Sequence, residues 1–598
     1  MSVILSFGEI SQKAKNAFAK FPISLIWAIL GTLYTIWFIG AEDSILGEEK
    51  TPYTKVILIA SLGLSWLIST RFLINYFKEE KQQNKQWLIV FPLLFLGWFY
   101  WYLPNDKSAF SNDIYSYKIT LYYIAGHLFV FFSPFVFTWN KKAYWNYLKI
   151  IFIAIVRSLL FSLVLYLGLV LALLALKFLF KIDIEEEVYL KLFVFCLGIV
   201  NTWIFLSDFP QKIHNNITIN YPKALEVFVK YILIPLSILY LVILYAYSLK
   251  ILIHWNLPKG WVSYLVIALS ILGFSIHILI NPIRKTTDSR VIKRFYPWFY
   301  RLLIPMLLLL FAAIYKRISE YGFTENRYFV LVLAFWILGM TSYILWSKKK
   351  ELRYFPITIM LISVLSSFGF WGAFSVAERS QLKQFSDIFM EIKAKNFKIT
   401  PEEDNRFTSI IKYLTQRKAI DKTADLVGFN PSQAFKEASA WSMATSIKDT
   451  LRVVVVHDKH TYKNNGYFGL NETDKTLEVK GYDYFRQVNF HQYPPDLGRS
   501  IADSIQNYKM YLDFDKPIFV IYKDSLSKYT INLKPLIDSL KADDRDNIPD
   551  SKLTIEKEFD AIKVKLLFQS LYIDANDSIS KLNNVNLYVL LKTKTNAQ

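Results

Sequence analysis

Four charged side chains are concentrated between two long apolar stretches, and this pattern is the one most open to a chemical role. Residues 317–328 read RISEYGFTENRY, and their charged members are Arg317, Glu320, Glu325 and Arg327. Two charges of each sign at a membrane boundary could form a gate or bind a charged ligand. The alternative is a tight turn between helices, held by ion pairs, in which Gly322 permits an unusual backbone angle and Thr324 caps the next helix. The pattern favours the turn, and a gate or a site for a charged ligand remains the alternative.

Three ionisable side chains lie inside apolar stretches: Arg157, His127 and His277. Lipid penalises a central arginine by about 2.5–3.5 kcal/mol on insertion scales, so such groups are expected to face the interior of a helical bundle. They are therefore candidates for transport or proton relay. Arg157 lies near the start of its stretch, which leaves a second interpretation, in which its long side chain reaches the headgroup layer.

The sequence contains no pattern that predicts a metal site or a cofactor. His457 and His460 are three residues apart but follow a predicted strand, which favours solvated turn polarity over a metal site. Cys196 is the only cysteine, so neither an intrachain disulfide nor a thiolate cluster can form. Glycine-rich phosphate loops, zinc-protease motifs, nucleophile elbows and kinase motifs are absent from the sequence. We expect no cofactor and no metal, and the balance is against an enzyme.

Long apolar stretches must position these residues, because each is about as long as a helix needs to cross ~30 Å of hydrocarbon at ~1.5 Å per residue. The backbone must form its hydrogen bonds internally in lipid, so these stretches predict helices. They are residues 21–40, 55–77, 87–104, 117–139, 150–176, 188–207, 226–249, 261–281, 299–315, 327–346 and 356–377. Residues 1–377 therefore form an all-α polytopic membrane helical bundle with about 11 transmembrane helices.

The positive charge of the chain lies almost entirely in this apolar part. Residues 1–377 hold 36 Lys and Arg against 19 Asp and Glu, whereas residues 378–598 hold 33 against 30. Basic residues between apolar segments are typical of a protein whose partner is the lipid bilayer, and they argue against nucleic acid. The chain thus belongs to the membrane class.

The basic loops predict the orientation. The loops richer in Lys and Arg are residues 1–20, 78–86, 140–149, 208–223, 283–296 and 347–354. The positive-inside rule places these loops, and with them the N-terminus, in the cytoplasm. An odd number of spans then places the C-terminal part on the extracytoplasmic, or periplasmic, side.

Residues 378–598 are predicted to form a soluble α+β domain. Amphipathic helices come first, and strands with alternating apolar and polar residues follow, as in residues 562–566. A segment of this length can bury its own core. The predicted domains are therefore a transmembrane helical domain, 1–377, and a soluble α+β domain, 378–598.

Several segments together resemble a known family. They are Lys20-Phe21-Pro22, Arg157-Ser158-Leu159-Leu160, the run from Trp203 to Pro210, Tyr221-Pro222-Lys223-Ala224 and, above all, Arg317 to Tyr328. This set, spread over nearly the whole chain, resembles the DUF4153 family of bacterial membrane proteins. The resemblance implies a multi-pass protein of the inner (plasma) membrane with a C-terminal soluble domain. It implies no catalytic residue.

Three functions remain open at this point. The first is a non-enzymatic envelope protein that anchors a domain, passes a signal or binds an envelope protein partner. The second is a secondary transporter or permease-like protein, for which Arg157, His127 and His277 should line one polar cavity. The third is an integral membrane enzyme acting on lipid or envelope precursors, for which the charged segment 317–328 is the one candidate cluster.

Overall fold

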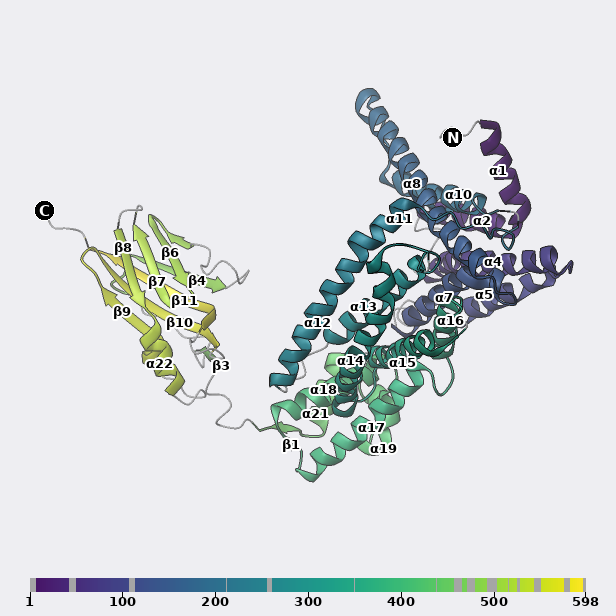
Figure 1. Cartoon of the computed structure of the whole chain (residues 1–598). Helices are drawn as coiled ribbons and strands as arrows, with labels where there is room; N and C mark the ends of the chain where they lie inside the picture. Colours follow the sequence, from purple (N-terminus) through teal and green to yellow (C-terminus); the bar gives the residue numbers. More distant parts are fainter. Residues whose placement is uncertain are drawn as a thin grey trace. The chain divides into compact units, whose positions relative to one another are not determined.

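Apolar side chains at helical spacing and alternating side chains in the C-terminal part give the chain two kinds of structure. A computed structural model describes residues 7–41, 50–106, 113–210, 212–254, 261–284, 286–348, 350–436, 438–456, 465–469, 479–491, 503–514, 516–523, 527–542, 550–574 and 581–594. The contacts divide the chain into a helical unit, Met1–Ala394 with Asn405–Arg452, and a β unit, Lys395–Asp404 with Val453–Gln598. Figure 1 shows both units.

The helical unit follows the apolar stretches of the sequence. Its first half contains α1 (Phe7–Lys20), α2 (Pro22–Ile39), α4 (Thr51–Glu80), η1 (Gln86–Ile89), α5 (Val90–Tyr102), α7 (Asp113–Phe132), η2 (Ser133–Phe135), α8 (Lys141–Phe180), α9 (Glu186–Phe195), the π-helix η3 (Cys196–Asn201) and α10 (Thr202–Ser207). Its second half contains α11 (Lys223–Phe228), the π-helix η4 (Val229–Leu233), α12 (Ile234–His254), α13 (Trp261–Ile280), α14 (Arg290–Tyr321), α15 (Glu325–Trp346), α16 (Tyr354–Ser366) and α17 (Ala373–Ala394). Shorter helices follow: α18 (Pro401–Gln416), η5 (Ile420–Thr423), α19 (Ala424–Val427), α20 (Pro431–Ala434) and α21 (Ala440–Thr450).

Eight helical segments among the described residues are long and apolar enough to cross a membrane. They are Pro22–Ile39, Thr51–Lys78, Lys141–Phe180, Glu186–Ser207, Lys223–His254, Val262–Ile280, Arg290–Tyr321 and Glu325–Trp346. The segments Gln86–Tyr102 and Tyr354–Ser366 are apolar but shorter. Each of the predicted stretches contains a helix, yet the predicted number of about 11 spans is not confirmed.

The last predicted stretch, residues 356–377, is not one continuous helix. Helix α16 ends at Ser366, and Gly369 has a φ of +79°, which a residue without a Cβ adopts without strain. Helix α17 then begins at Ala373. Hydropathy predicted one continuous helix here because the turn between the two helices is itself apolar and aromatic.

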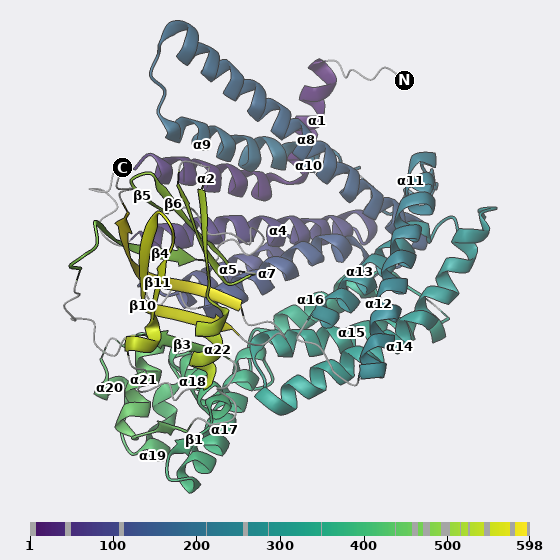
Figure 2. The ribbon, with the colours of Figure 1, turned by 90° about the vertical axis from the view of Figure 1, so that its left-hand side faces the viewer.

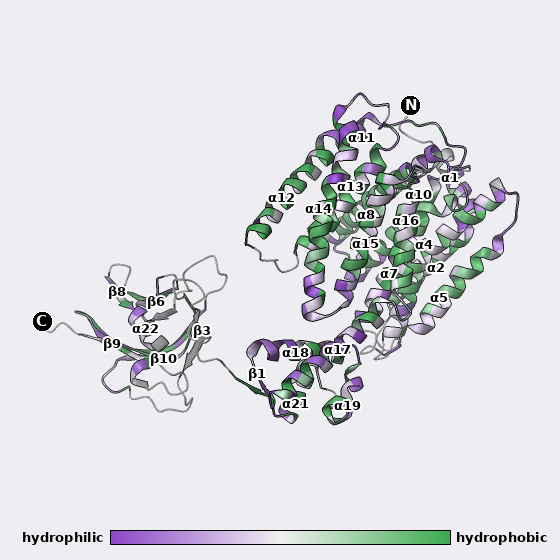
Figure 3. Cartoon of the chain, turned by 60° about the horizontal axis from the view of Figure 1, so that its bottom comes forward, coloured by the Kyte–Doolittle hydropathy of each residue, from purple (hydrophilic) through white to green (hydrophobic). Residues whose placement is uncertain are grey.

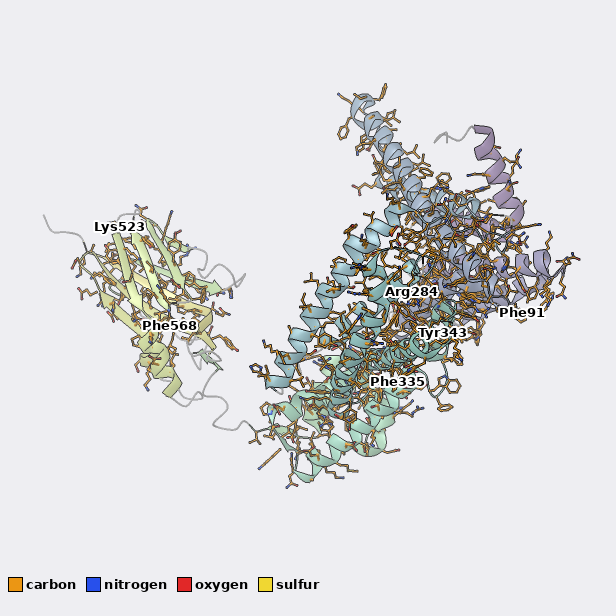
Figure 4. The ribbon with its side chains drawn as sticks, in the orientation of Figure 1. Phe91, Arg284, Phe335, Tyr343, Lys523 and Phe568 are labelled. Atoms are coloured by element: carbon orange, nitrogen blue, oxygen red, sulfur yellow. The ribbon has the colours of Figure 1, made fainter. Side chains whose placement is uncertain are left out.

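The helices of the helical unit consist largely of hydrophobic residues, as the hydropathy colours of Figure 3 show, and many of their large apolar side chains are exposed. Leu171 and Phe178 of α8 are 66% and 75% exposed, and Phe91 and Phe335, both labelled in Figure 4, are 59% and 58% exposed. Water would strongly disfavour so much exposed apolar surface, whereas lipid tails accept it. The helical unit is therefore a membrane bundle.

Contacts between the predicted loops gather them at two ends of the bundle. We call the first the basic end, made of the loops predicted to be cytoplasmic, and the second the opposite end. At the basic end the contacts join Lys20 with Pro210, Arg71 with Lys20, Asn146 with Asn216, Thr287 with Glu226, and Arg353 with Val136. At the opposite end they join Lys55 with Asn105 and Tyr117 with Asn326. Within each end, these contacts bring together segments that are far apart in the sequence.

Helix α2 approaches the π-helix η3 closely, and Gly198 permits this. A Cβ at Gly198 would lie 2.0 Å from the Thr32 Oγ1. Gly168 of α8 has no heavy atom within 4 Å of the same position. A side chain at residue 198 therefore has no room, whereas one at residue 168 does.

We expect Gly198→Ala to lower the free energy of unfolding by about 1–3 kcal/mol, the usual cost of overpacking. Gly168→Ala, the matched control, should be neutral or stabilising because alanine is the better helix former. Thermal unfolding of both variants in detergent checks this. Equal melting temperatures for the two variants would contradict the close approach.

Among its described residues, the β unit contains two antiparallel sheets, the helix α22 (Lys534–Ala542), the 3-10 helix η9 (Asp550–Leu553) and one further ladder. Strands β3 (Asn465–Gly469), β10 (Ile562–Asp574), β11 (Lys581–Thr593) and β4 (Tyr484–His491) form one sheet, and β9 (Thr554–Glu558) pairs with β10. Strands β5 (Asp503–Ile505), β6 (Tyr508–Asp513), β7 (Ile518–Lys523) and β8 (Ser527–Asn532) form the second. The short strands β1 (Lys398–Ile399) and β2 (Val454–Val455) pair in parallel.

Both sheets and α22 contribute to one core, in which Phe490 of β4 and Phe519 of β7 lie with ring centroids 5.9 Å apart. The C-terminal region therefore contains β-sheets with an apolar core. Figure 2 shows these strands from another side. The division into units differs from a boundary at residue 378, because Ala373–Ala394 is one helix and Asn405–Arg452 belongs to the helical unit.

Candidate functional site

The segment 317–328 contains the end of α14, a turn at residues 322–324 and the start of α15. Gly322 ends α14 with a φ of +67°, and its N–H donates to the Ile318 carbonyl at 2.9 Å. A Cβ at this position would lie 2.8 Å from the Ser380 Oγ, so glycine is required by both its angle and its neighbour. Thr324 lies at the start of α15, but its side chain makes no capping hydrogen bond, contrary to expectation. The predicted turn is confirmed, whereas the prediction that Thr324 caps the next helix is wrong.

Side chains of α17 hold this turn through its backbone. The Phe323 N–H donates to the Ser380 Oγ at 2.8 Å. The Gln381 Nε2 donates to the carbonyls of Tyr321 and Phe323 at 3.0 and 2.7 Å, and Gln381 is buried. Buried polar groups that are all paired fix one geometry, because leaving any of them unpaired is costly. Helix α17 is thereby bound to the end of the α14–α15 hairpin.

Glu325 forms a buried ion pair with a residue far along the chain. Its Oε1 lies 2.9 Å from the Arg417 Nε, and the exposed fractions of the two side chains are 4% and 9%. The Tyr413 hydroxyl donates to the same carboxylate oxygen at 2.9 Å. We call Glu325, Arg417 and Tyr413 the clamp. It connects the start of α15 with the helical segment after α17.

Electrostatics keep Arg417 and Tyr413 in the forms that their contacts require. Burial acts to lower the pKa of Arg417, but the Glu325 carboxylate and Tyr413 outweigh it, so the pKa stands above its ordinary value. Burial, followed by the Glu325 charge, raises the pKa of the Tyr413 hydroxyl. At neutral pH the guanidinium is therefore charged, and the phenol keeps the proton that it donates.

The other charged residues of the segment do not join the clamp. Arg327 Nη1 donates to the carbonyls of Tyr321 and Gly322 at 3.0 and 2.8 Å, so it binds the C-terminus of α14. Glu320 lies 4.0 Å from Lys316 on the surface of α14. Arg317 is partly buried on the same helix. Glu320, Glu325 and Arg327 thus make separate contacts, and no ion pair within the segment links Arg317 or Arg327 to Glu320 or Glu325 among the described contacts.

Arg417 and Tyr413 were missed by the sequence reasoning. Tyr413 lies near the end of α18, and Arg417 follows the helix directly, with its N–H donating to the Tyr413 carbonyl at 3.0 Å; this spacing of four residues is the only local signal they give. That spacing does not reveal which acidic residue they reach. The packing of α18 beside α15 in the folded chain is what brings them to Glu325.

Arg157 and His127 lie outside the bundle interior, and the expectation that both face inward is wrong. The Arg157 side chain is 43% exposed, and its Nη1 lies 2.6 Å from the Asp208 Oδ1. Asp208 belongs to the basic end, so the contact agrees with the alternative in which the arginine extends toward the headgroups. His127 is exposed, and its Nδ1 lies 2.8 Å from the Tyr123 carbonyl one turn earlier.

His277 is buried in the bundle, as expected. Its exposed fraction is 3%, and its Nε2 lies 3.3 Å from the Asn281 Nδ2. Its ring packs against Tyr296, with centroids 4.8 Å apart, and the Arg284 guanidinium lies 3.8 Å from the centroid of the same tyrosine ring. Figure 4 labels Arg284. His277 shares no described contact with Arg157 or His127.

An apolar cleft of about 530 Å³ lies between α7, α8, α13, α15 and α16. Lys149 is the one charged residue among those that line it. Neither Arg157, His127 nor His277 borders this cleft. No group of three or more His, Cys, Asp or Glu side chains that could hold a metal occurs among the described residues, and the pair His457 and His460 lies outside them.

The sequence model of the family described as "Domain of unknown function (DUF4153)" matches residues 24–388. The chain belongs to this family. The DUF4153 match covers the bundle from α2 into α17, so it includes the α14–α15 turn and Glu325 but ends before Tyr413 and Arg417. The family resemblance seen in the sequence is confirmed.

A second comparison finds an uncharacterized protein of Pasteurella multocida (strain Pm70) that is 25% identical over 406 residues. The match covers 66% of this chain and 62% of the relative, which is less than two thirds of the relative's length. No solved structure matches the chain.

Proposed function

We propose that this protein is a non-enzymatic, multi-pass protein of the bacterial inner membrane that anchors the β unit on the extracytoplasmic side and binds an envelope protein partner there. About 11 spans, counting the shorter apolar helices and α7, carry the chain across the bilayer. The N-terminus and the basic end face the cytoplasm. The observation that carries the proposal is the clamp, because it fixes the helical segment before the β unit to the end of the bundle.

The clamp suits anchoring rather than chemistry. Glu325 and Arg417 are buried and paired with each other, and Tyr413 uses the same oxygen, so no member of the clamp is left to act on a substrate. Together with Gln381 and Ser380, these side chains attach α17 and α18 to the α14–α15 turn. A rigid attachment of this kind is what an anchor or a signal relay across the membrane requires.

Transport receives less support. A transporter was expected to bring Arg157, His127 and His277 together around one polar cavity. Arg157 pairs with Asp208, His127 contacts its own helix, and His277 is packed among aromatic rings. An enzyme acting on lipid or envelope precursors receives no support from the segment 317–328, since Arg327 binds the turn and Glu325 is buried in the clamp, so its four charged residues form no common cluster.

Cysteine labelling tests the proposed sidedness. Cys196 is the only cysteine and is 1% exposed, so a Cys196→Ser background removes an already buried thiol. In this background we expect Asp449→Cys, on α21, to react with a membrane-impermeant maleimide in spheroplasts. Lys142→Cys, at the basic end, should react only after the membrane is opened. Labelling of Lys142→Cys in intact spheroplasts would contradict the orientation.

A cleavage experiment tests the anchoring role. A protease site inserted after Val456 in the full chain allows the β unit to be released after membrane insertion. Under the proposal, cells whose protein has been cleaved show the phenotype of a strain that lacks this protein. Cells whose protein carries a scrambled, uncleavable site do not show it. A transporter would keep its function after cleavage, because its bundle is untouched.

A further inference from the structure

A polar pocket of about 390 Å³ lies at the basic end, away from the clamp. Residues of α1, α4, α10 and the segment after α10 form it; the first three are labelled in Figure 2. Five of its lining residues are cationic: Lys13, Lys20, Arg71, Lys78 and Lys212. None of its described lining residues is acidic. So many like charges around one cavity repel one another unless an anion occupies it.

Two of the cations are held in place by the fold. Arg71 is 9% exposed; its Nε donates to the Lys20 carbonyl at 2.6 Å, and its Nη1 donates to the Gln86 Oε1 at 2.7 Å. The Lys20 Nζ donates to the Pro210 carbonyl. Lys13, Lys78 and Lys212 are exposed around them. The pocket is therefore built on a fixed base with an exposed cationic rim.

A buried amide supplies an independent sign of a ligand. Asn75 lines the same pocket, is 7% exposed, and its Nδ2 has no hydrogen-bond partner among the described residues. Buried polar groups in native structures are nearly always paired, and an unpaired one points to a missing partner. An amide N–H₂ is only a donor, so the missing partner is a hydrogen-bond acceptor.

We propose that this pocket binds a phosphate-bearing anion. A phosphate group brings negative charge for the five cations and oxygen acceptors for the Asn75 amide. Two sources share this chemistry: the headgroup of an anionic phospholipid at the membrane surface and a soluble phosphate. Basic pockets between membrane helices are suited to phospholipid headgroups, since the local positive charge attracts them.

Binding is measured on the full chain in two arms. In the first, inorganic phosphate is titrated into the protein in uncharged detergent by calorimetry. In the second, the protein is placed in phosphatidylcholine nanodiscs that contain some phosphatidylglycerol, and the retained phosphatidylglycerol is counted by native mass spectrometry. Lys13→Gln/Lys78→Gln/Lys212→Gln should weaken binding about a hundredfold, and Asn75→Leu about tenfold.

The matched control removes the same charge from the same end of the bundle without touching the pocket: Lys15→Gln/Lys142→Gln/Lys293→Gln, which should bind as the native chain does. Lys15 is on the same helix as Lys13 but does not line the pocket. Phosphate binding in detergent identifies a soluble ligand, and phosphatidylglycerol retention alone identifies a headgroup. No binding in either arm, or an equal loss in the control, overturns the proposal. The exposed lysines carry little packing, so the triple variant keeps the test valid if Asn75→Leu fails to fold.

Discussion

Replacing Glu325 with alanine is expected to weaken the attachment of residues 405–452 to the bundle by about 3–5 kcal/mol. The reason is that Arg417 would remain buried and charged with no carboxylate beside it, which costs far more than the net value of the pair. Hydrogen exchange along α18 and α21 measures the effect directly. Exchange there should accelerate strongly, while exchange in α8 should not change.

Two further variants make this result specific. Glu320→Ala removes a carboxylate from the surface of α14, where the distance to Lys316 is 4.0 Å, and should change stability by no more than about 1 kcal/mol. Glu325→Leu/Arg417→Met removes both buried charges and should restore most of the protection. If Glu325→Ala left the exchange of α18 unchanged, the clamp would not be what holds this segment.

Phe72→Ala is expected to lower the free energy of unfolding of the bundle by about 3–5 kcal/mol, the usual range for a buried phenylalanine. Phe72 is 1% exposed and touches rings from three other parts of the chain. Its ring centroid lies 5.1 Å from that of Phe21, 4.8 Å from that of Phe209 and 5.7 Å from that of Tyr147. Removing it leaves a cavity where four parts of the chain meet.

The control for this prediction is the same substitution on the outside of the bundle. Phe178 is 75% exposed, so Phe178→Ala removes a side chain that faces lipid and should change stability by about 0.5 kcal/mol or less. Thermal unfolding of both variants in the same detergent gives the comparison. A similar fall for both would mean that the aromatic cluster at the basic end is not packed as described.

Much of the β unit was predictable from alternation. Residues 562–566 were expected as a strand and form the start of β10, Ile562–Asp574. Strand β9, Thr554–Glu558, was missed because its sequence TIEKE is mostly charged and it pairs at the edge of the sheet, where one side faces water. Alternation fails for such strands because few of their side chains enter the core.

The sequence alone determined the class of the protein and the approximate positions of most of its helices, because the length and polarity of a segment are properties of that segment. It could not determine which way a side chain faces or what it meets. Arg157 and His277 are both ionisable residues inside apolar stretches, so the sequence does not distinguish their surroundings. In the structure Arg157 extends to Asp208 at the surface, whereas His277 is enclosed by Tyr296 and Phe355. The rotation of each helix decides this, and packing against its neighbours fixes that rotation.

The clamp shows the same limit most clearly. Glu325 was recognised as a charged residue at a membrane boundary, and Arg417 lies in a segment predicted to be soluble. Their contact exists only because α17 returns along the α14–α15 turn and brings α18 beside α15. Pairing between residues so distant in the chain depends on the whole path between them, and that path is decided by tertiary packing rather than by any local pattern.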